Sequence, residues 1–163
     1  MIKKTVTTSP IRKKANSRNS SVSISDNIST ALLSRYTLTK NRHDLVSQAR
    51  KGLKPTIFDD IVNITGFRKE HVAQWLDVSE KTISNYKKEN RLLSPTQGEK
   101  TLKVIALFKK GESVFGNIEL FHQWLEKPAF GLFNEVPLGL MGTSTGIDLI
   151  EEELIRIEYG DLA

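Results

Sequence analysis

Residues 69–88 hold the pattern that most constrains the fold, because they have the features of two short amphipathic helices joined by a tight turn. In the first helix, Val72, Trp75 and Leu76 recur at i, i+3 and i+4, which places their side chains on one helical face. The second helix follows Ser79, a residue type that caps helix N-termini well. This stretch therefore predicts a pair of packed helices.

The connection between these helices, at residues 76–78, is predicted to be the turn of a helix-turn-helix motif. Asp77 lies at its centre, and aspartate is one of the few residues besides glycine that tolerates a left-handed backbone. Ala73 is small enough to let a second helix cross closely. Ile83 and Tyr86 are expected to face inward, because they are spaced by three residues. The second helix is the predicted recognition helix.

The outward face of this second helix has side chains that suit a DNA groove. Lysine, serine and asparagine side chains reach phosphates and base edges. The predicted DNA-binding residues are Ser79, Lys81, Thr82, Ser84, Asn85 and Lys88. Glu80 and Lys87 are expected on the same outward face. The alternative is an ordinary helical hairpin with a solvated charged face, since short motifs also match by accident. The cap, the small residue and the apolar spacing together favour DNA binding.

The net charge of +5 hides a strong asymmetry along the chain. Residues 1–55 carry twelve Lys or Arg and two Asp, and residues 68–110 carry ten basic and five acidic side chains. Residues 111–163 carry ten acidic side chains and two basic ones. This asymmetry indicates a polyanion as the partner of the first two regions and a less acidic partner for the last.

Catalytic and metal-binding functions have little support in the sequence. The chain has no cysteine, so it can form neither a disulfide nor a thiolate metal site. His43, His71 and His122 have no partners at the spacing of a metal site or a catalytic triad. The acidic runs at 59–60 and 151–153 are expected to diverge around their helices. We predict a protein that is not an enzyme and has no cofactor or metal. No apolar run approaches the roughly 18 residues of a membrane span.

Residues 1–55 are predicted to form a basic tail that is largely disordered, because scattered apolar residues cannot offset the entropy of ordering. Residues 12–14 are basic and could contact phosphates without reading sequence. A purely solvated tail and an organellar transit peptide are the alternatives. Within this tail, residues 31–52 are weakly helical, and Gly52 is expected to end a helix that contains Ala49.

Residues 56–110 are predicted to form the DNA-binding domain. Apolar residues at 57–64 supply its first helix. Ser94 and Pro95 are the N-cap and first residue of its last helix, which Gly111 is expected to end.

Residues 111–163 are predicted to form a second, small helical domain. A helix follows Asn117, and an apolar loop at 130–133 comes after it. The final helix buries apolar residues at i, i+3, i+7 and i+10 from Ile147 onward. Its glutamates at 151–153 are expected mostly on the outer face. The fold class predicted for the whole chain is all-α.

Several short motifs follow the helix-turn-helix in a definite order. They are Leu92-Leu93-Ser94-Pro95, Val114-Phe115-Gly116, Trp124-Leu125, Pro128, Pro137-Leu138, Thr143, Gly146, Leu154, Ile157-Glu158 and Gly160. In this order, the chain from about residue 56 to residue 160 resembles the Xre/MbcA/ParS-type antitoxins, which are paired with RES-domain toxins in bacteria. The residues after 110 are the more specific part of the resemblance, because many unrelated regulators share an Xre-like helix-turn-helix.

The resemblance implies a bifunctional protein, and the lack of cysteine is compatible with the cytoplasmic location that we expect. The helix-turn-helix would bind the operator DNA of its own promoter as a homodimer. The C-terminal domain would bind a RES-domain toxin, which uses NAD, and cover its active-site cleft. The acidic end of the chain is compatible with a basic, anion-binding cleft. The predicted toxin-binding residues are Glu151, Glu153, Arg156, Glu158 and Tyr159.

Two other functions remain open at this point. A plain transcriptional regulator would use the same helix-turn-helix and keep the C-terminal domain for dimerisation or a small ligand. A pure interaction protein would not bind DNA at all. Trp124, Phe130 and Phe133 are expected in the core rather than in a ligand pocket.

Overall fold

The computed structural model describes residues 31–34 and 42–160, and within these ranges it is helical without a β-sheet. The all-α prediction is confirmed for this part of the chain. The predicted disorder of residues 1–29 lies outside the described residues. The elements are α2 (Arg42–Lys51), α3 (Ile57–Thr65), α4 (Lys69–Trp75), α5 (Glu80–Lys88), α6 (Pro95–Phe115), α7 (Ile118–Leu125), the 3-10 turn η1 (Phe130–Leu132), α8 (Pro137–Leu140) and α9 (Ser144–Glu158).

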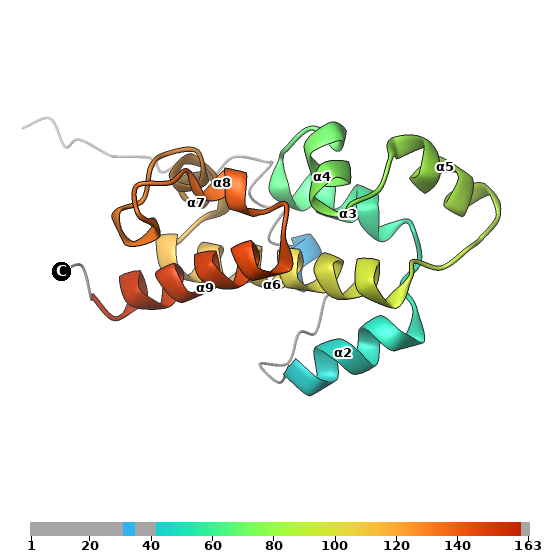
Figure 1. The fold of residues 1–163 in the computed structure, drawn as a ribbon, viewed down its shortest axis with the longest axis horizontal. Helices are drawn as coiled ribbons and strands as arrows, with labels where there is room; N and C mark the ends of the chain where they lie inside the picture. Colours follow the sequence, from blue (N-terminus) through green and yellow to red (C-terminus); the bar gives the residue numbers. More distant parts are fainter. Residues whose placement is uncertain (1–30, 35–41, 161–163) are drawn as a thin grey trace, which may run out of the picture.

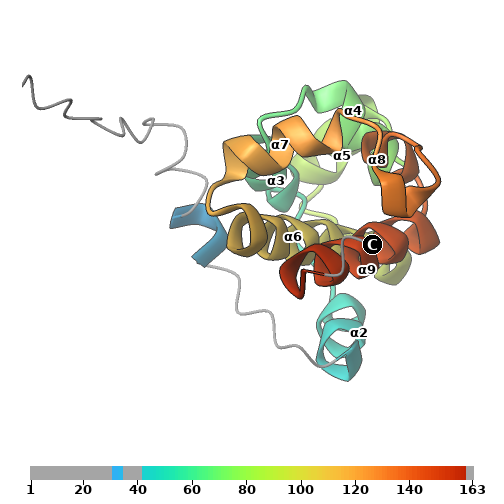
Figure 2. The same cartoon turned by 90° about the vertical axis from the view of Figure 1, so that its left-hand side faces the viewer.

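The long helix α6 is the element around which the others are arranged (Figures 1 and 2). Helix α2 packs along one side of α6, α9 runs beside it, and α7 covers its C-terminal half. The helix-turn-helix, α4 and α5, lies toward the N-terminal end of α6. Helix α6 begins with a capping box, in which the Ser94 side chain accepts from the backbone of Gln97 and the Gln97 side chain accepts from that of Ser94.

The expected end of α6 at Gly111 is wrong. Gly111 is buried inside the helix, which continues to Phe115 and ends at Gly116, whose φ is +84°. The glycine is needed for a different reason, because a Cβ there would overlap the ring of Phe121 from α7. The expected division between two domains at residue 110 therefore falls in the middle of a continuous helix.

The predicted helix before Gly52 is confirmed as α2, and Gly52 ends it with φ of +83°. This helix is not part of a separate tail. Ala49 is buried against α6 at Gly98, where an added Cβ would lie 3.4 Å from the Ala49 Cα. Beyond the helix, Leu53 accepts a backbone hydrogen bond from Leu93, with N–O distance 2.9 Å. The boundary expected at residue 56 thus leaves out a helix that packs on α6.

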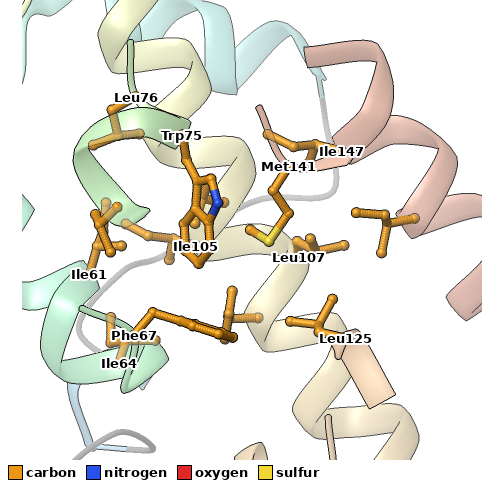
Figure 3. Close-up of a cluster of buried hydrophobic side chains, with 14 of the residues drawn as sticks. Ile61, Ile64, Phe67, Trp75, Leu76, Ile105, Leu107, Leu125, Met141 and Ile147 are labelled. Carbon is orange, nitrogen blue, oxygen red and sulfur yellow. The ribbon is translucent and has the colours of Figure 1, made fainter. Parts of the chain in front are cut away.

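A single hydrophobic core joins the two halves of the described chain (Figure 3). Trp75 from the helix-turn-helix and Met141 from the C-terminal half lie in the same buried cluster. Phe67, before α4, stacks on His122 of α7 with ring centroids 3.9 Å apart. Each fully buried large side chain contributes about 1.5–3 kcal/mol to folding. The two halves are therefore stabilised together.

Lysines of α6 fasten α9 along its length. The Lys103 Nζ lies 2.8 Å from both carboxylate oxygens of Asp148 and 2.7 Å from the Ser144 Oγ. About two turns further along, Lys110 pairs with Glu158 near the end of α9. These contacts occupy lysines that sequence analysis left without a role.

A third lysine of α6 binds the segment that precedes α9. The Lys100 Nζ donates to the carbonyl oxygen of Gly142 over 2.5 Å, just before α9. Burial lowers the pKa of Lys100 below its ordinary value of 10.5, and the nearby Asp77 carboxylate opposes this shift. Lys100 therefore joins α6 to the segment just before α9.

Candidate nucleic-acid interface and C-terminal surface

The turn between α4 and α5 has the geometry that the sequence predicts. Asp77 has a left-handed backbone with φ of +53°. Its N–H donates to the carbonyl of Gln74 over 3.1 Å, and the next N–H, of Val78, donates to that of Ala73 over 3.0 Å. Ala73 itself is buried, as close helix crossing requires. The helix-turn-helix is confirmed.

Ser79 caps α5 as predicted. Its Oγ accepts from the Thr82 N–H over 3.0 Å, and its hydroxyl lies 2.8 Å from the Thr82 Oγ1. Because the two hydroxyls bind each other, Ser79 and Thr82 hold the start of the recognition helix. Neither hydroxyl needs DNA as a partner.

The other predicted DNA-binding residues share one exposed face of α5. Lys81, Ser84, Asn85 and Lys88 are all exposed, and their spacing of i, i+3, i+4 and i+7 aligns them along the helix. This face combines two cations with an amide that can pair with adenine. The structure brings these four side chains together on one exposed face of α5.

Lys87 is not on this outward face, and its expected position is wrong. Its Nζ lies 2.7 Å from both carboxylate oxygens of Asp59 on α3 and 5.8 Å from the centre of the Phe58 ring. The pair fixes α5 on α3. Sequence reasoning missed Asp59, because nothing local marks a contact between residues 28 positions apart.

The predicted outward position of Glu153 is also wrong. Its side chain is buried on α9, with 5% of the residue exposed. The Arg156 Nη2 lies 2.7 Å from the Glu153 Oε2 as an ion pair without hydrogen-bond geometry, so Oε2 accepts no hydrogen bond. The same Arg156 nitrogen donates to the Gly131 carbonyl of η1 over 3.1 Å. Glu153 and Arg156 thus support η1.

The remaining predicted toxin-binding residues have different surroundings. Glu151 is half-buried, and Glu158 is exposed but paired with Lys110. Tyr159, just after α9, is 80% exposed. The five residues therefore do not form one uniform acidic surface.

Phe130 and Phe133 are not in the core, contrary to expectation. They are 78% and 93% exposed, whereas Ala129 and Leu132 of the same loop are buried. The loop has left-handed backbone at Phe133, with φ of +56°, and at Asn134, with φ of +61°. This chain reversal turns both phenylalanines outward. Trp124 is half-buried in a cluster of aromatic rings on α7 and α6.

Comparison with protein families gives two adjacent matches. Residues 44–106 match the antitoxin Xre-like helix-turn-helix domain. Residues 110–160 match the antitoxin Xre/MbcA/ParS C-terminal toxin-binding domain. The chain is an Xre/MbcA/ParS-type antitoxin. It is not an enzyme, since both matched domains are binding domains. A comparison with curated protein sequences finds no match.

The two matches agree with the geometry of the antitoxin. The first starts inside α2, the helix that packs on α6, and covers the whole helix-turn-helix. The second contains η1 and all of α9. Within the described ranges, no three His, Asp or Glu side chains gather as a metal site would, and no helix is long and apolar enough to span a membrane.

The recognition helix and the end of the toxin-binding domain lie far apart on the antitoxin. Helix α5 lies at one end of the molecule, and α7 with the C-terminal end of α9 lies at the other (Figure 1). Helix α6, whose 21 residues span about 30 Å, runs between them. DNA and a protein partner could therefore be bound without competing for one surface.

Proposed function

We propose that this antitoxin neutralises a RES-domain toxin, which consumes NAD. We also propose that the antitoxin is a cytoplasmic homodimer and that it represses its own operon. Helix α5 would enter the major groove of the operator. The C-terminal domain would cover the active-site cleft of the toxin, with Arg156, Glu158 and Tyr159 near the contact. Glu151 would lie at its edge, and Glu153 would act indirectly by supporting η1.

The observation that carries the proposal is the placement of two unlike surfaces at opposite ends. One exposed face of α5 presents Lys81, Ser84, Asn85 and Lys88, and α5 lies at the opposite end of the molecule from α7 and the end of α9 (Figure 1). The region after residue 110 is acidic, which suits an anion-binding cleft. A cleft that binds NAD must accommodate phosphates, so carboxylates that mimic them are suitable occupants.

The DNA-binding part of the proposal can be tested with Asn85→Ala in a gel-shift assay on the region upstream of the gene. Loss of a bidentate contact to adenine costs about 1–3 kcal/mol, or roughly 5- to 150-fold in affinity. Gln123→Ala is the control, because it removes an exposed amide from α7, far from α5. If both variants bind the operator as tightly as the parent, Asn85 on α5 does not recognise DNA.

The toxin-binding part can be tested by expressing the neighbouring reading frame with and without the antitoxin. We expect growth arrest from the neighbour alone and rescue by the full chain. If the neighbour is harmless, the function reduces to that of a plain regulator.

A further inference from the structure

The loop around η1 displays two large aromatic side chains that the described residues leave exposed. Phe130 and Phe133 are 78% and 93% exposed. Contiguous exposed apolar patches commonly mark binding sites. Phenylalanine, tyrosine and arginine side chains are enriched at protein interfaces.

The backbone holds this loop in one shape. The Ala129 N–H donates to the carbonyl of Glu135, and the Asn134 N–H donates to that of Ala129, each over 3.0 Å. Phe133 keeps a left-handed backbone that a bulky residue rarely adopts, and Asn134, a residue type that tolerates it, follows in the same conformation. Such strain persists where the surroundings enforce it, and it is concentrated at functional sites.

Helix α9 supports the loop through contacts with Gly131. Gly131 lies directly on the buried Glu153, because a Cβ at this position would overlap its carboxylate. Arg156 links the two by pairing with Glu153 and donating to the Gly131 carbonyl. A buried carboxylate adds little stability by itself, since its desolvation offsets its attraction to the cation. Its arrangement here fixes the position of η1.

Helix α9, whose Arg156 contacts η1, carries further exposed side chains. Leu149, Arg156 and Tyr159 are exposed and follow at i, i+7 and i+10, so they lie on one side of the helix. We call Phe130, Phe133 and these three residues the aromatic patch. It combines apolar anchors with one cation, as interface centres do.

We propose that Phe130 and Phe133 are the principal anchors by which the antitoxin holds its toxin. The toxin would present apolar pockets for the two rings, and Arg156 and Tyr159 would contact it around them. This inference rests on the proposed function and assigns the contact to a loop rather than to acidic residues. The whole aromatic patch lies inside the matched toxin-binding domain.

A second copy of the chain suits the aromatic patch less well than a toxin does. Docking through this end would place the two α5 helices at opposite ends of the pair. Their separation would be roughly 60 Å, which is twice the length of α6. Helix-turn-helix dimers that read adjacent half-sites place their recognition helices about 34 Å apart. The toxin is therefore the occupant that we assign.

The test compares the full-length parent with Phe130→Ala/Phe133→Ala in toxin capture and growth rescue, using the neighbouring RES-domain product as the probe. Truncating one anchor typically weakens binding by about 30-fold, so the double variant should lose at least about 100-fold. Its melting temperature and operator affinity should stay unchanged, because both side chains are exposed and far from α5. Leu120→Ala, which shortens a 46% exposed side chain of the same domain, is the control and should bind within about threefold.

The outcomes separate this inference from the proposed function. If the parent neutralises the toxin and the folded double variant does so equally well, the anchors lie elsewhere and the proposed function stands. If the parent is a dimer and the double variant is a monomer with full toxin affinity, the aromatic patch joins two copies and the assignment to the toxin is overturned. If the parent does not bind the neighbouring product, the proposed function fails and this inference fails with it.

Discussion

The substitution Gly111→Ala tests whether α6 runs through residue 111 against α7. An alanine in place of glycine inside a helix ordinarily stabilises it by about 1 kcal/mol. Here the new methyl group would overlap the ring of Phe121, which is fully buried and packs on Phe108, Phe115 and Trp124. The ring cannot move aside without displacing its neighbours. We therefore expect net destabilisation.

The magnitude follows from two opposing effects. Overpacking a core costs typically about 1–3 kcal/mol, and loss of a whole phenylalanine side chain sets an upper limit of about 3–5 kcal/mol. Taking about 2–4 kcal/mol for the rigid Phe121 ring and subtracting the helix gain leaves a loss of about 1–3 kcal/mol. For a chain of this size each kcal/mol lowers the melting temperature by about 2–4 °C.

Thermal and urea unfolding of the full chain provide the measurement. Gly139→Ala is the matched control, because an added Cβ at this exposed position in α8 meets no atom within 4 Å. It should be neutral or stabilising by up to about 1 kcal/mol. Phe121→Leu should relieve the overlap, so the double variant with Gly111→Ala should lose less than the sum of the single changes. Stabilisation by Gly111→Ala alone would refute the close packing of α6 on α7.

Two further predictions concern the ion pairs of α5 and α9. Lys88→Ala should lower the salt dependence of operator binding by about one unit of slope, as a lost phosphate contact does, whereas Lys87→Ala should leave it unchanged, since Lys87 is held by Asp59. Equal slopes for the two variants in salt-titrated gel shifts would contradict the orientation of α5. Arg156→Gln should lower the free energy of unfolding by about 1–3 kcal/mol, because it leaves Glu153 buried without its cation. The double variant with Glu153→Gln should recover part of this loss in urea unfolding, and an equal or larger loss would show that the unpaired carboxylate is not its cause.

Local signals explain why the helix-turn-helix could be predicted. The spacing of Val72 and Trp75, the tolerance of Asp77 for positive φ and the cap at Ser79 each involve residues within one or two turns of each other. Such features depend on backbone geometry that every chain shares. The helix at α2 and its end at Gly52 were predictable for the same reason.

The errors occur where a residue's role depends on a distant segment. Gly111 is of a residue type that often ends a helix, yet its role here is to give Phe121 room to pack. Glu153 looks like one acid in a solvated run, yet η1 covers it. Phe133 looks like a core residue, and only the loop conformation exposes it. Periodicity within one helix carries no information about which segment packs on it.

The shared core gives a way to interpret variants of this antitoxin. Phe67 belongs to the DNA-binding half and stacks on His122 of the toxin-binding half, so a cavity there should weaken folding and both activities together. Surface changes on α5 or on η1 are separated by the length of α6 and share no partners, and distant substitutions of this kind act independently. A variant that loses one activity and keeps its stability therefore reports on a binding surface, whereas one that loses both reports on the core. This distinction assigns a defect to Asn85 or to Phe133 without a structure of either complex.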